Sequence, residues 1–195
     1  MWFAAVFLPM VASQLLRLSQ KDPAFWLACD YGGRLLALAV LAVHPQARRI
    51  AFRRENLTAP LGLVAAWMAG LIFVEVSLLP YLGHAIDRLI PGSKIGLYPE
   101  TTGILHLVDA VFGLALVAFH EEIVFRRCAR AFFGEGDGLV VKSALLFALY
   151  HWWTGLGNMA EAGVFGILAM LAYRRCGGLW PVVVAHYLID AITFF

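Results

Sequence analysis

The sequence predicts an all-α protein, a polytopic transmembrane bundle of about six to seven membrane helices in a single domain over residues 1–195. Of the 195 residues, 62% are hydrophobic and 14% are charged, and the mean hydropathy is +0.78. Soluble domains carry about 25% charged and about 45–50% apolar residues. Because a soluble fold of this size has too little interior to hide the excess, lipid must surround much of the surface. The apolar residues also form runs of helix length.

Charged or Gly/Pro-rich breaks separate these runs, which we take in order as candidate membrane helices. A spanning helix needs about 20 residues. The second and third runs meet this length, and the fourth is longer and carries charges in its second half. The last three are short, so we expect tilted or incomplete spans there, with loops at membrane depth that line a cavity. The seven runs are Trp2–Leu16, Ala24–Val43, Ala59–Leu79, Gly103–Phe133, Leu139–Trp153, Asn158–Tyr173 and Gly178–Phe195.

Other local features complete the predicted organisation. The first run begins without a basic segment, so we interpret it as a membrane helix and not as a cleaved signal. Between Tyr81 and Ile90, apolar residues recur at helical spacing beside His84, Asp87 and Arg88, which is typical of a short helix in the membrane interface. The cysteines form no CxxC pair, so we expect small core residues and neither a disulfide framework nor a structural zinc site. They are Cys29, Cys128 and Cys176.

The placement of arginine and lysine predicts the orientation, because cytoplasmic loops carry an excess of these residues. If all seven runs span the membrane, the arginine-rich connections after the second, fourth and sixth runs share one side. The opposite side receives only Arg17 and Lys21, then Arg88 and Lys94. We therefore expect the N-terminus and the arginine-rich loops in the cytoplasm and the C-terminus outside. The arginines of these loops are Arg48, Arg49, Arg53, Arg54, Arg126, Arg127, Arg130, Arg174 and Arg175.

Five ionisable residues inside the fourth, fifth and seventh runs are candidate site residues. Each costs about 2.5–3.5 kcal/mol at the bilayer centre, so they are tolerable only if they converge. A helix rise of about 1.5 Å per residue places them at similar depths, although Trp152 and Trp153 could form an outer aromatic belt that raises the fifth run. The five are Glu121, Glu122, His151, His186 and Asp190.

Helix geometry separates the two glutamates. Glu122 and Arg126 are spaced i,i+4 with the glutamate first, the favourable order for an ion pair within a helix. Glu121 is rotated by about 100° from Glu122 and can face a cavity. His186 and Asp190 are also four apart and share one face of their helix. A carboxylate and an imidazole acting on one water molecule can hydrolyse a peptide bond.

Three ordered motifs resemble those of a known family. They are Glu-Glu-x-x-x-Arg at Glu121 to Arg126, Phe-x-x-x-His at Phe147 to His151, and His-x-x-x-Asp at His186 to Asp190. Together they resemble the CPBP family, the CAAX protease and bacteriocin-processing family also called Abi, which includes the Rce1-type CAAX prenyl endopeptidases. The resemblance covers residues 103–195, which we interpret as the catalytic core.

The resemblance implies an all-helical glutamic intramembrane endopeptidase that needs no cofactor and no obligatory metal. The implied roles are activation of water by Glu121 and His151, support of the glutamate by Glu122 and Arg126, and stabilisation of the oxyanion by His186 and Asp190. The prenyl endopeptidases of the family have Asn where this chain has Asp190. An ionised aspartate cannot donate a hydrogen bond, so this difference bears on the oxyanion role.

Other polar residues in the runs receive structural interpretations. Glu75 is alone in the third run and is interpreted as a structural or protonated carboxyl group. Asp30 and Arg34 are spaced i,i+4 and are expected to pair with each other. Asp109 is interpreted as interfacial. Glu161 begins the sixth run at a depth similar to the candidate site, so a place at the border of the cavity is left open.

The leading hypothesis is an endopeptidase of a bacterial plasma membrane that acts on a membrane-associated or lipid-modified protein or peptide. The expected partners are this substrate and the lipid bilayer; no motif indicates nucleic acid binding, and the oligomeric state is left open. One alternative is a zinc-dependent membrane metallopeptidase, although the sequence has no HExxH motif. Two others are a non-catalytic membrane immunity or scaffold protein and a transporter that uses the buried charges as an ion path.

Overall fold

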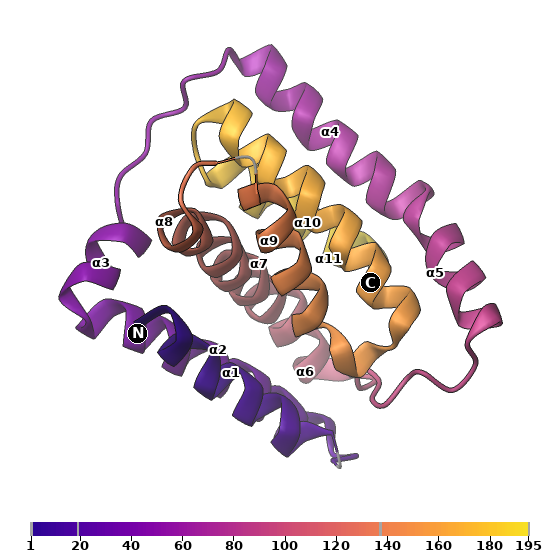
Figure 1. The fold of residues 1–195 in the computed structure, drawn as a ribbon. Helices are drawn as coiled ribbons and strands as arrows, with labels where there is room; N and C mark the ends of the chain where they lie inside the picture. The colour runs from indigo at the N-terminus through magenta and orange to yellow at the C-terminus, as the bar shows by residue number, and fades with distance from the viewer. Residues whose placement is uncertain (1, 19, 137, 195) are drawn as a thin grey trace.

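The computed structural model describes residues 2–18, 20–136 and 138–194, and within these ranges it contains helices and no strand. Two π-helical stretches, Asp109–Gly113 and Ile123–Cys128, join α6, α7 and α8 into one long helix, and a 3-10 turn, Trp152–Thr154, follows α9. The α-helices labelled in Figure 1 are α1 (Trp2–Arg17), α2 (Pro23–Val43), α3 (Pro45–Ala51), α4 (Leu61–Ser77), α5 (Leu79–Leu89), α6 (Gly103–Val108), α7 (Leu114–Glu122), α8 (Ala129–Phe133), α9 (Gly138–Tyr150), α10 (Leu156–Cys176) and α11 (Trp180–Phe194).

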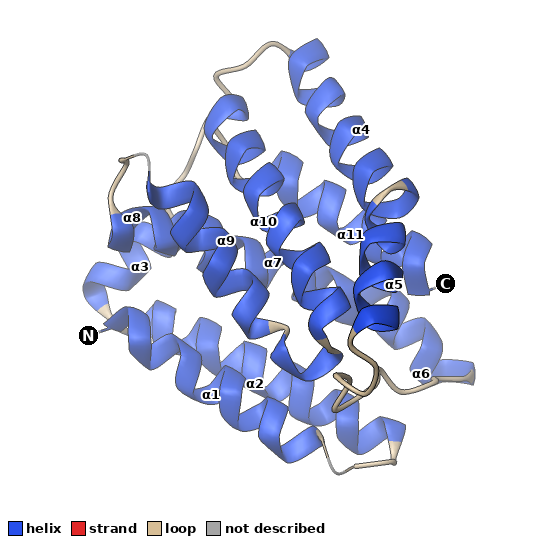
Figure 2. Cartoon of the chain, turned by 45° about the vertical axis from the view of Figure 1, so that its right-hand side comes forward, coloured by secondary structure: helices blue, strands red, loops and turns tan. Residues whose placement is uncertain are grey.

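Helix α7 occupies the middle of the bundle, with α2 against one side and α11 against the other. The hairpin of α1 and α2 covers one flank, and α9 packs against α10 (Figures 1 and 2). Helices α4 and α5 lie on the outside against α10 and α11. Only 11% of the most apolar window of residues 61–89 is buried within the protein. A helix that is apolar all round and uncovered by protein is typical of one that contacts lipid.

Local sequence explains where several helices begin and end. Asp22 accepts a hydrogen bond from the backbone N–H of Phe25 at 3.0 Å, and Pro23 follows it as the first residue of α2, a typical N-cap arrangement. Helix α10 ends at Gly177, whose φ of 75° lies in the left-handed region that favours glycine. Pro80 lies in the first turn of α5, where its missing N–H costs no helical hydrogen bond.

The predicted all-helical class is confirmed, and each of the seven predicted runs contains a helix. Among the described residues, four stretches are long and apolar enough to cross a membrane, whereas α1, α9 and α11 are apolar but shorter. The total of about six to seven membrane helices therefore stays a prediction. The four stretches are Pro23–Val43, Leu61–Leu89, Gly103–Phe133 and Leu156–Cys176.

Some boundaries differ from the prediction. The sixth helix is longer than the run 158–173, because Arg174 and Arg175 continue it into a last turn where cations are favourable. Helix α3 was not predicted; the side chain of His44 accepts a hydrogen bond from the backbone N–H of Ala47 and caps it. The predicted interfacial segment is helical as α5, and its position in a membrane stays a prediction. Phe195, the end of the seventh run, lies outside the described residues.

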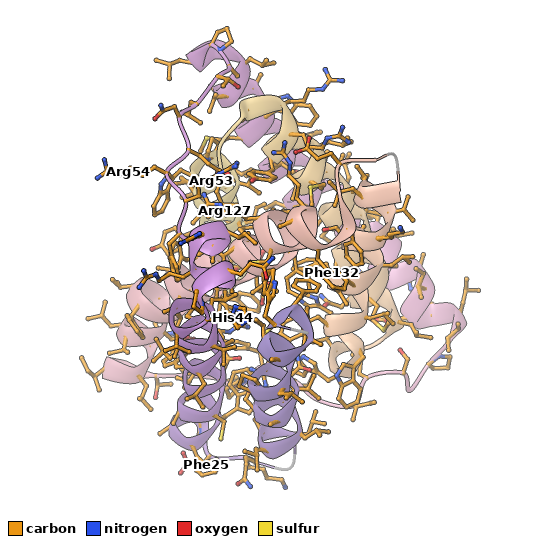
Figure 3. All side chains as sticks on the ribbon, turned by 60° about the vertical axis from the view of Figure 1, so that its left-hand side comes forward. Phe25, His44, Arg53, Arg54, Arg127 and Phe132 are labelled. Atoms are coloured by element: carbon orange, nitrogen blue, oxygen red, sulfur yellow. The ribbon has the colours of Figure 1, made fainter. Side chains whose placement is uncertain are left out.

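Arg53 and Arg54, in the linker between α3 and α4, lie near Arg127 at one end of the bundle, which we call the arginine-bearing end (Figure 3). The linker between α3 and α4 meets the turn after α10, where the backbone N–H of Thr58 donates to the carbonyl of Cys176 at 3.1 Å. The start of α1 lies at the same end, since Phe3 stacks on Phe132 with ring centroids 4.6 Å apart. The C-terminal end of α11 lies at the opposite end (Figure 2). The predicted alternation of the helix connections between the two sides of the membrane fits this arrangement. Which end faces the cytoplasm stays a prediction.

Candidate active site

A cavity of about 400 Å³ lies inside the bundle, between residues of α2, α4, α7, α9, α10 and α11. Four of the six predicted site residues line the cavity: Glu121, His151, His186 and Asp190. The other two, Glu122 and Arg126, are fully buried beside it. The structure therefore brings together the ionisable residues that were expected to converge.

Glu121 is held through only one of its two carboxylate oxygens. Its Oε1 accepts a hydrogen bond from Nη1 of Arg34 on α2 at 2.6 Å, and its side chain is 2% exposed. Its Oε2 has no hydrogen-bond partner among the described residues and lies 3.9 Å from Nε2 of His186. That distance is too long for a direct hydrogen bond, but one water molecule can bridge it. Oε2 is therefore the oxygen of Glu121 whose capacity to accept hydrogen bonds is unused among the described residues.

Glu122 uses both carboxylate oxygens within the protein. Nε of Arg126 donates to Oε2 at 2.7 Å, which confirms the predicted i,i+4 pair. Oε1 lies 2.8 Å from Nδ1 of His186. The resemblance implied that this pair supports the catalytic glutamate. The structure places Glu122 against His186, and the arginine that contacts Glu121 is Arg34, so the supporting role of Glu122 and Arg126 stays a prediction.

His186 is fixed in orientation between carboxyl groups. An ionised Glu122 can only accept a hydrogen bond, so Nδ1 of His186 carries a proton. The other nitrogen, Nε2, lies 3.6 Å from Oδ2 of Asp190 and 3.9 Å from Oε2 of Glu121. The imidazole ring also packs against the ring of Phe165, with centroids 5.0 Å apart. These contacts direct Nε2 towards the part of the cavity that Glu121 and Asp190 share.

His151 is fixed by the backbone at the end of α9. Its Nδ1 lies 2.9 Å from the carbonyl oxygen of Phe147, one helical turn earlier. Because a carbonyl only accepts hydrogen bonds, Nδ1 carries the proton and Nε2 keeps its lone pair. The ring of Phe147 lies 4.7 Å from the ring of His151 and 6.3 Å from that of His186. In the Phe-x-x-x-His motif, the backbone carbonyl of Phe147 therefore fixes the imidazole of His151, and the ring of Phe147 lies between the imidazoles of His151 and His186.

Comparison with known proteins identifies the segment that contains all six residues. Residues 103–192 match the family model described as type II CAAX prenyl endopeptidase Rce1-like. This segment is similar to the Rce1-like family. The resemblance predicted from the three motifs is confirmed, and the match supports a CAAX-type protease in a membrane.

A curated relative gives a different description. The probable membrane transporter protein of Xylella fastidiosa (strain Temecula1 / ATCC 700964) is 28% identical to this chain. The alignment covers 65% of the chain and 55% of the relative, so the chain spans about half the length of the curated relative that it matches. No solved structure matches the chain significantly.

A series of buried charges connects the Rce1-like segment to α1 and α2. Nε of Arg34 donates to Oδ2 of Asp30 at 2.9 Å, which confirms the predicted pair. Asp30 also accepts a hydrogen bond from Arg17 at the end of α1. Arg34 thus bonds to Asp30 and Glu121 at once, and it lies outside residues 103–192. The sequence marks Arg34 only as the neighbour of Asp30, because its contact with Glu121 joins positions 87 apart.

Trp153 is buried inside the protein and so does not face lipid in an outer aromatic belt, whereas Trp152 is half-buried. Trp153 is 6% exposed, and the guanidinium of Arg17 lies 4.5 Å from its ring and 4.2 Å from the ring of Trp26. Trp152 donates a hydrogen bond from Nε1 to the side-chain oxygen of Gln14 at 3.0 Å. A buried guanidinium gains from electron-rich rings, which explains the inward position of the Trp153 indole.

Asp109 is buried inside the protein, and its position at the membrane interface stays a prediction. It accepts hydrogen bonds from the hydroxyl groups of Tyr31 at 2.6 Å and Tyr98 at 2.7 Å. These phenols take the place of water around the carboxylate, and both come from outside the helix that holds Asp109. Burial and the Asp109 carboxylate raise the pKa of Tyr98 well above its usual value, so the phenol remains a donor.

Several further polar residues surround the candidate site. Glu75 of α4 and Glu161 of α10 line the cavity, so Glu161 does border the candidate site. Oε2 of Glu75 has no hydrogen-bond partner among the described residues, and its structural interpretation stays a prediction. His120, which belongs to no motif, is fully buried, with Nδ1 3.3 Å from Nη1 of Arg34.

Metal binding would require a change in this arrangement. In the part of the chain that the structure describes, no group of three or more His, Cys, Asp and Glu side chains is placed to hold a metal ion. A zinc-dependent metallopeptidase would therefore need the two imidazoles and the carboxylates of the cavity to move closer together.

Proposed function

We propose that this chain is an intramembrane endopeptidase in which Glu121 and His151 activate water to hydrolyse a peptide bond. The observation that supports this proposal most is the asymmetric binding of Glu121. Arg34 holds Oε1, whereas Oε2 has no partner among the described residues and belongs to a side chain that lines the cavity with two imidazoles. A carboxylate that is fixed on one side and open on the other suits a general base.

In the first step, water attacks the carbonyl carbon of the scissile bond. Oε2 of Glu121 takes a proton from the water as the new C–O bond forms. Nε2 of His151 accepts a hydrogen bond from the second O–H and orients the water molecule. The carbonyl electron pair moves to the carbonyl oxygen, and the product is a tetrahedral oxyanion.

The oxyanion is stabilised by His186 and Asp190. His186 donates a hydrogen bond from Nδ1 to Glu122. When its imidazole is doubly protonated, its Nε2–H donates a second hydrogen bond to the oxyanion. Asp190 donates as well when its carboxyl group is protonated. In the second step the carbonyl re-forms, the C–N bond breaks, and Glu121 returns its proton to the leaving amine. Bonds and protons balance with one water consumed for each peptide bond.

The surroundings of the site support a substrate that is associated with the membrane. Four long apolar stretches supply many of the residues around the cavity. We infer a membrane-associated or lipid-modified protein or peptide as the substrate, and a bacterial plasma membrane as the location. Within this scheme, residues 103–195 form the catalytic core and α1 and α2 provide the charge series that ends at Glu121.

Cleavage by the purified protein tests the proposal. Reconstituted protein is incubated with a lipid-modified peptide, and the products are identified by mass spectrometry. Glu121→Gln keeps the shape of the side chain and removes the base, so cleavage should fall to background. Glu135→Gln makes the same chemical change on a loop side chain that is 72% exposed, and it should cleave as the wild type does. Cleavage by Glu121→Gln at the wild-type rate would overturn the assignment of the base.

Transport is a second candidate function, favoured by the description of the curated relative as a probable membrane transporter. The series Arg17, Asp30, Arg34 and Glu121 could also pass an ion or a proton from the end of α1 to the cavity, as one part of a path across the bundle. Proteoliposomes with an internal pH indicator separate the two functions. Glu121-dependent proton flux without peptide products supports transport, and products without flux support the endopeptidase.

A further inference from the structure

A second cavity of about 310 Å³ opens at the arginine-bearing end of the bundle and shares no lining residue with the candidate active site. Its walls come from the linker between α3 and α4, from α7 and the π-helical stretch after it, and from the start of α11. We call it the arginine pocket after Arg53, Arg54 and Arg127, which Figure 3 labels.

The charged wall of the arginine pocket has an excess of cations. Three arginines and one glutamate line it, a formal net charge of +2. The glutamate, Glu55, is already occupied, because Arg127 donates to its Oε2 and the Tyr173 hydroxyl donates to its Oε1, each at 2.7 Å. Arg53 donates one long hydrogen bond to Oε1 of Glu55 at 3.4 Å and is 63% exposed, and Arg54 makes no ion pair among the described residues. The guanidinium of Arg54 is therefore available to an anion, and Arg53 keeps N–H groups that its bond to Glu55 does not use.

The linker that carries these arginines is held in place. The backbone N–H of Leu179 donates to Oε2 of Glu55 at 3.1 Å, so one carboxylate joins the linker, α10 and the start of α11. Burial raises the pKa of Glu55, but hydrogen bonds from Arg127 and Tyr173 outweigh it and hold the pKa below its usual value. An ionised Glu55 thus fixes the backbone beside Arg53 and Arg54.

The opposite wall of the pocket is apolar and continues along α11. Phe119 and Trp180 stack with ring centroids 5.8 Å apart. From Trp180, side chains at intervals of four residues form an exposed apolar stripe about 18 Å long at 1.5 Å per residue. This stripe starts at the pocket and runs away from the arginine-bearing end. Its members are Trp180, Val184, Leu188 and Ile192.

We propose that the arginine pocket binds an anionic phospholipid, with the phosphate at Arg53 and Arg54 and an acyl chain along the α11 stripe. Guanidinium groups match the geometry of phosphate oxygens and bind them with two hydrogen bonds each. A free phosphate ion would use only the charged wall, and an acidic peptide would have no need of the stripe. The combination of both features fits an amphiphile, and it does not depend on the proposed peptidase activity.

Native mass spectrometry of the full chain in detergent tests this binding. The probes are phosphatidylglycerol and phosphatidylcholine with identical acyl chains. The double variant Arg53→Gln/Arg54→Gln should lose about 30-fold in affinity for phosphatidylglycerol. Each arginine near an anionic headgroup usually contributes about fivefold in affinity, and the variant removes two. Arg54→Gln alone, at an exposed side chain, should lose about fivefold. Arg174→Gln/Arg175→Gln is the matched control, because it removes the same charge at the same end outside the pocket.

The proposal predicts preferential binding of phosphatidylglycerol, retained in the control and weakened in the pocket variants at unchanged melting temperature. Equal binding of both lipids would overturn it, and so would an equal loss in the control, which would indicate attraction by overall charge. Displacement of the lipid by inorganic phosphate or by an acidic peptide at comparable concentration would also overturn it, because the apolar stripe would then contribute nothing.

Discussion

Replacing Arg34 by methionine removes the guanidinium from the middle of the buried charge series and keeps an unbranched side chain. Two short contacts are lost, 2.6 Å to Glu121 and 2.9 Å to Asp30, from a side chain that is 6% exposed. Asp30 keeps Arg17, whereas Glu121 is left without its arginine. Removing one partner of a buried pair costs about 3–5 kcal/mol. At about 2–4 °C per kcal/mol for a chain of this size, the melting temperature should fall by about 6–20 °C.

A double-mutant cycle separates this pair from other effects of the substitution. Arg34→Met/Glu121→Gln removes the uncompensated charge together with its former partner, so it should recover most of the lost stability without recovering cleavage. Arg34→Lys keeps the charge, but its single ammonium cannot hold both carboxylates as the planar guanidinium does, and its stability should be intermediate.

Thermal unfolding in detergent and peptide cleavage are measured on the same preparations. The reasoning is refuted if Arg34→Met melts with the wild type, because the contact would then contribute no stability. It is also refuted if the double variant is as unstable as Arg34→Met, because Glu121 would then not be the group that is left unpaired.

Three further predictions follow from the site and from the arginine-bearing end. Asp190→Ala should lose about 100-fold or more in turnover, whereas Asp190→Asn, which always has a donor, should stay active and extend activity to higher pH in a pH–rate profile. If Asp190→Asn is as inactive as Asp190→Ala in this profile, Asp190 does not stabilise the oxyanion by donating a hydrogen bond. Chelation with EDTA or phenanthroline should reduce turnover little; stoichiometric zinc, with activity restored only by added metal, would favour the metallopeptidase. The lowered pKa of Glu55 should stabilise the fold above its ordinary pKa of 4.5 and lose this effect as the pH falls through the lower folded value. Glu55→Gln should remove that component of the acid dependence of the melting temperature, and identical profiles would contradict it.

The sequence predicts the parts of the site that depend on short spacing. Glu122 with Arg126 and Asp30 with Arg34 are pairs within one helical turn, and both form as expected. Convergence was also predictable, because isolated charges are costly in lipid and the residues lie at similar depths. The all-helical class was predictable because unpaired backbone groups are also costly in lipid, and a helix satisfies the hydrogen bonds of an apolar run within the run itself.

Contacts between distant segments were not predictable from spacing. Nothing in the sequence places Arg34 next to Glu121, because this contact depends on how α2 packs against α7. The hydrogen bonds of Asp109 were not predicted either, because its donors, Tyr31 and Tyr98, lie 78 and 11 positions away. The inward position of Trp153 likewise depends on the buried guanidinium of Arg17. In each case a polar group is satisfied by a partner that only the tertiary fold supplies.

The most direct test of the central claim is mass spectrometry of membrane peptides from cells that produce the wild type, Glu121→Gln or Glu135→Gln at equal membrane levels. We predict a set of peptides with new ends that is present with the wild type and Glu135→Gln and absent with Glu121→Gln. The same peptides at wild-type abundance with Glu121→Gln would contradict the proposal that Glu121 activates water in an intramembrane endopeptidase.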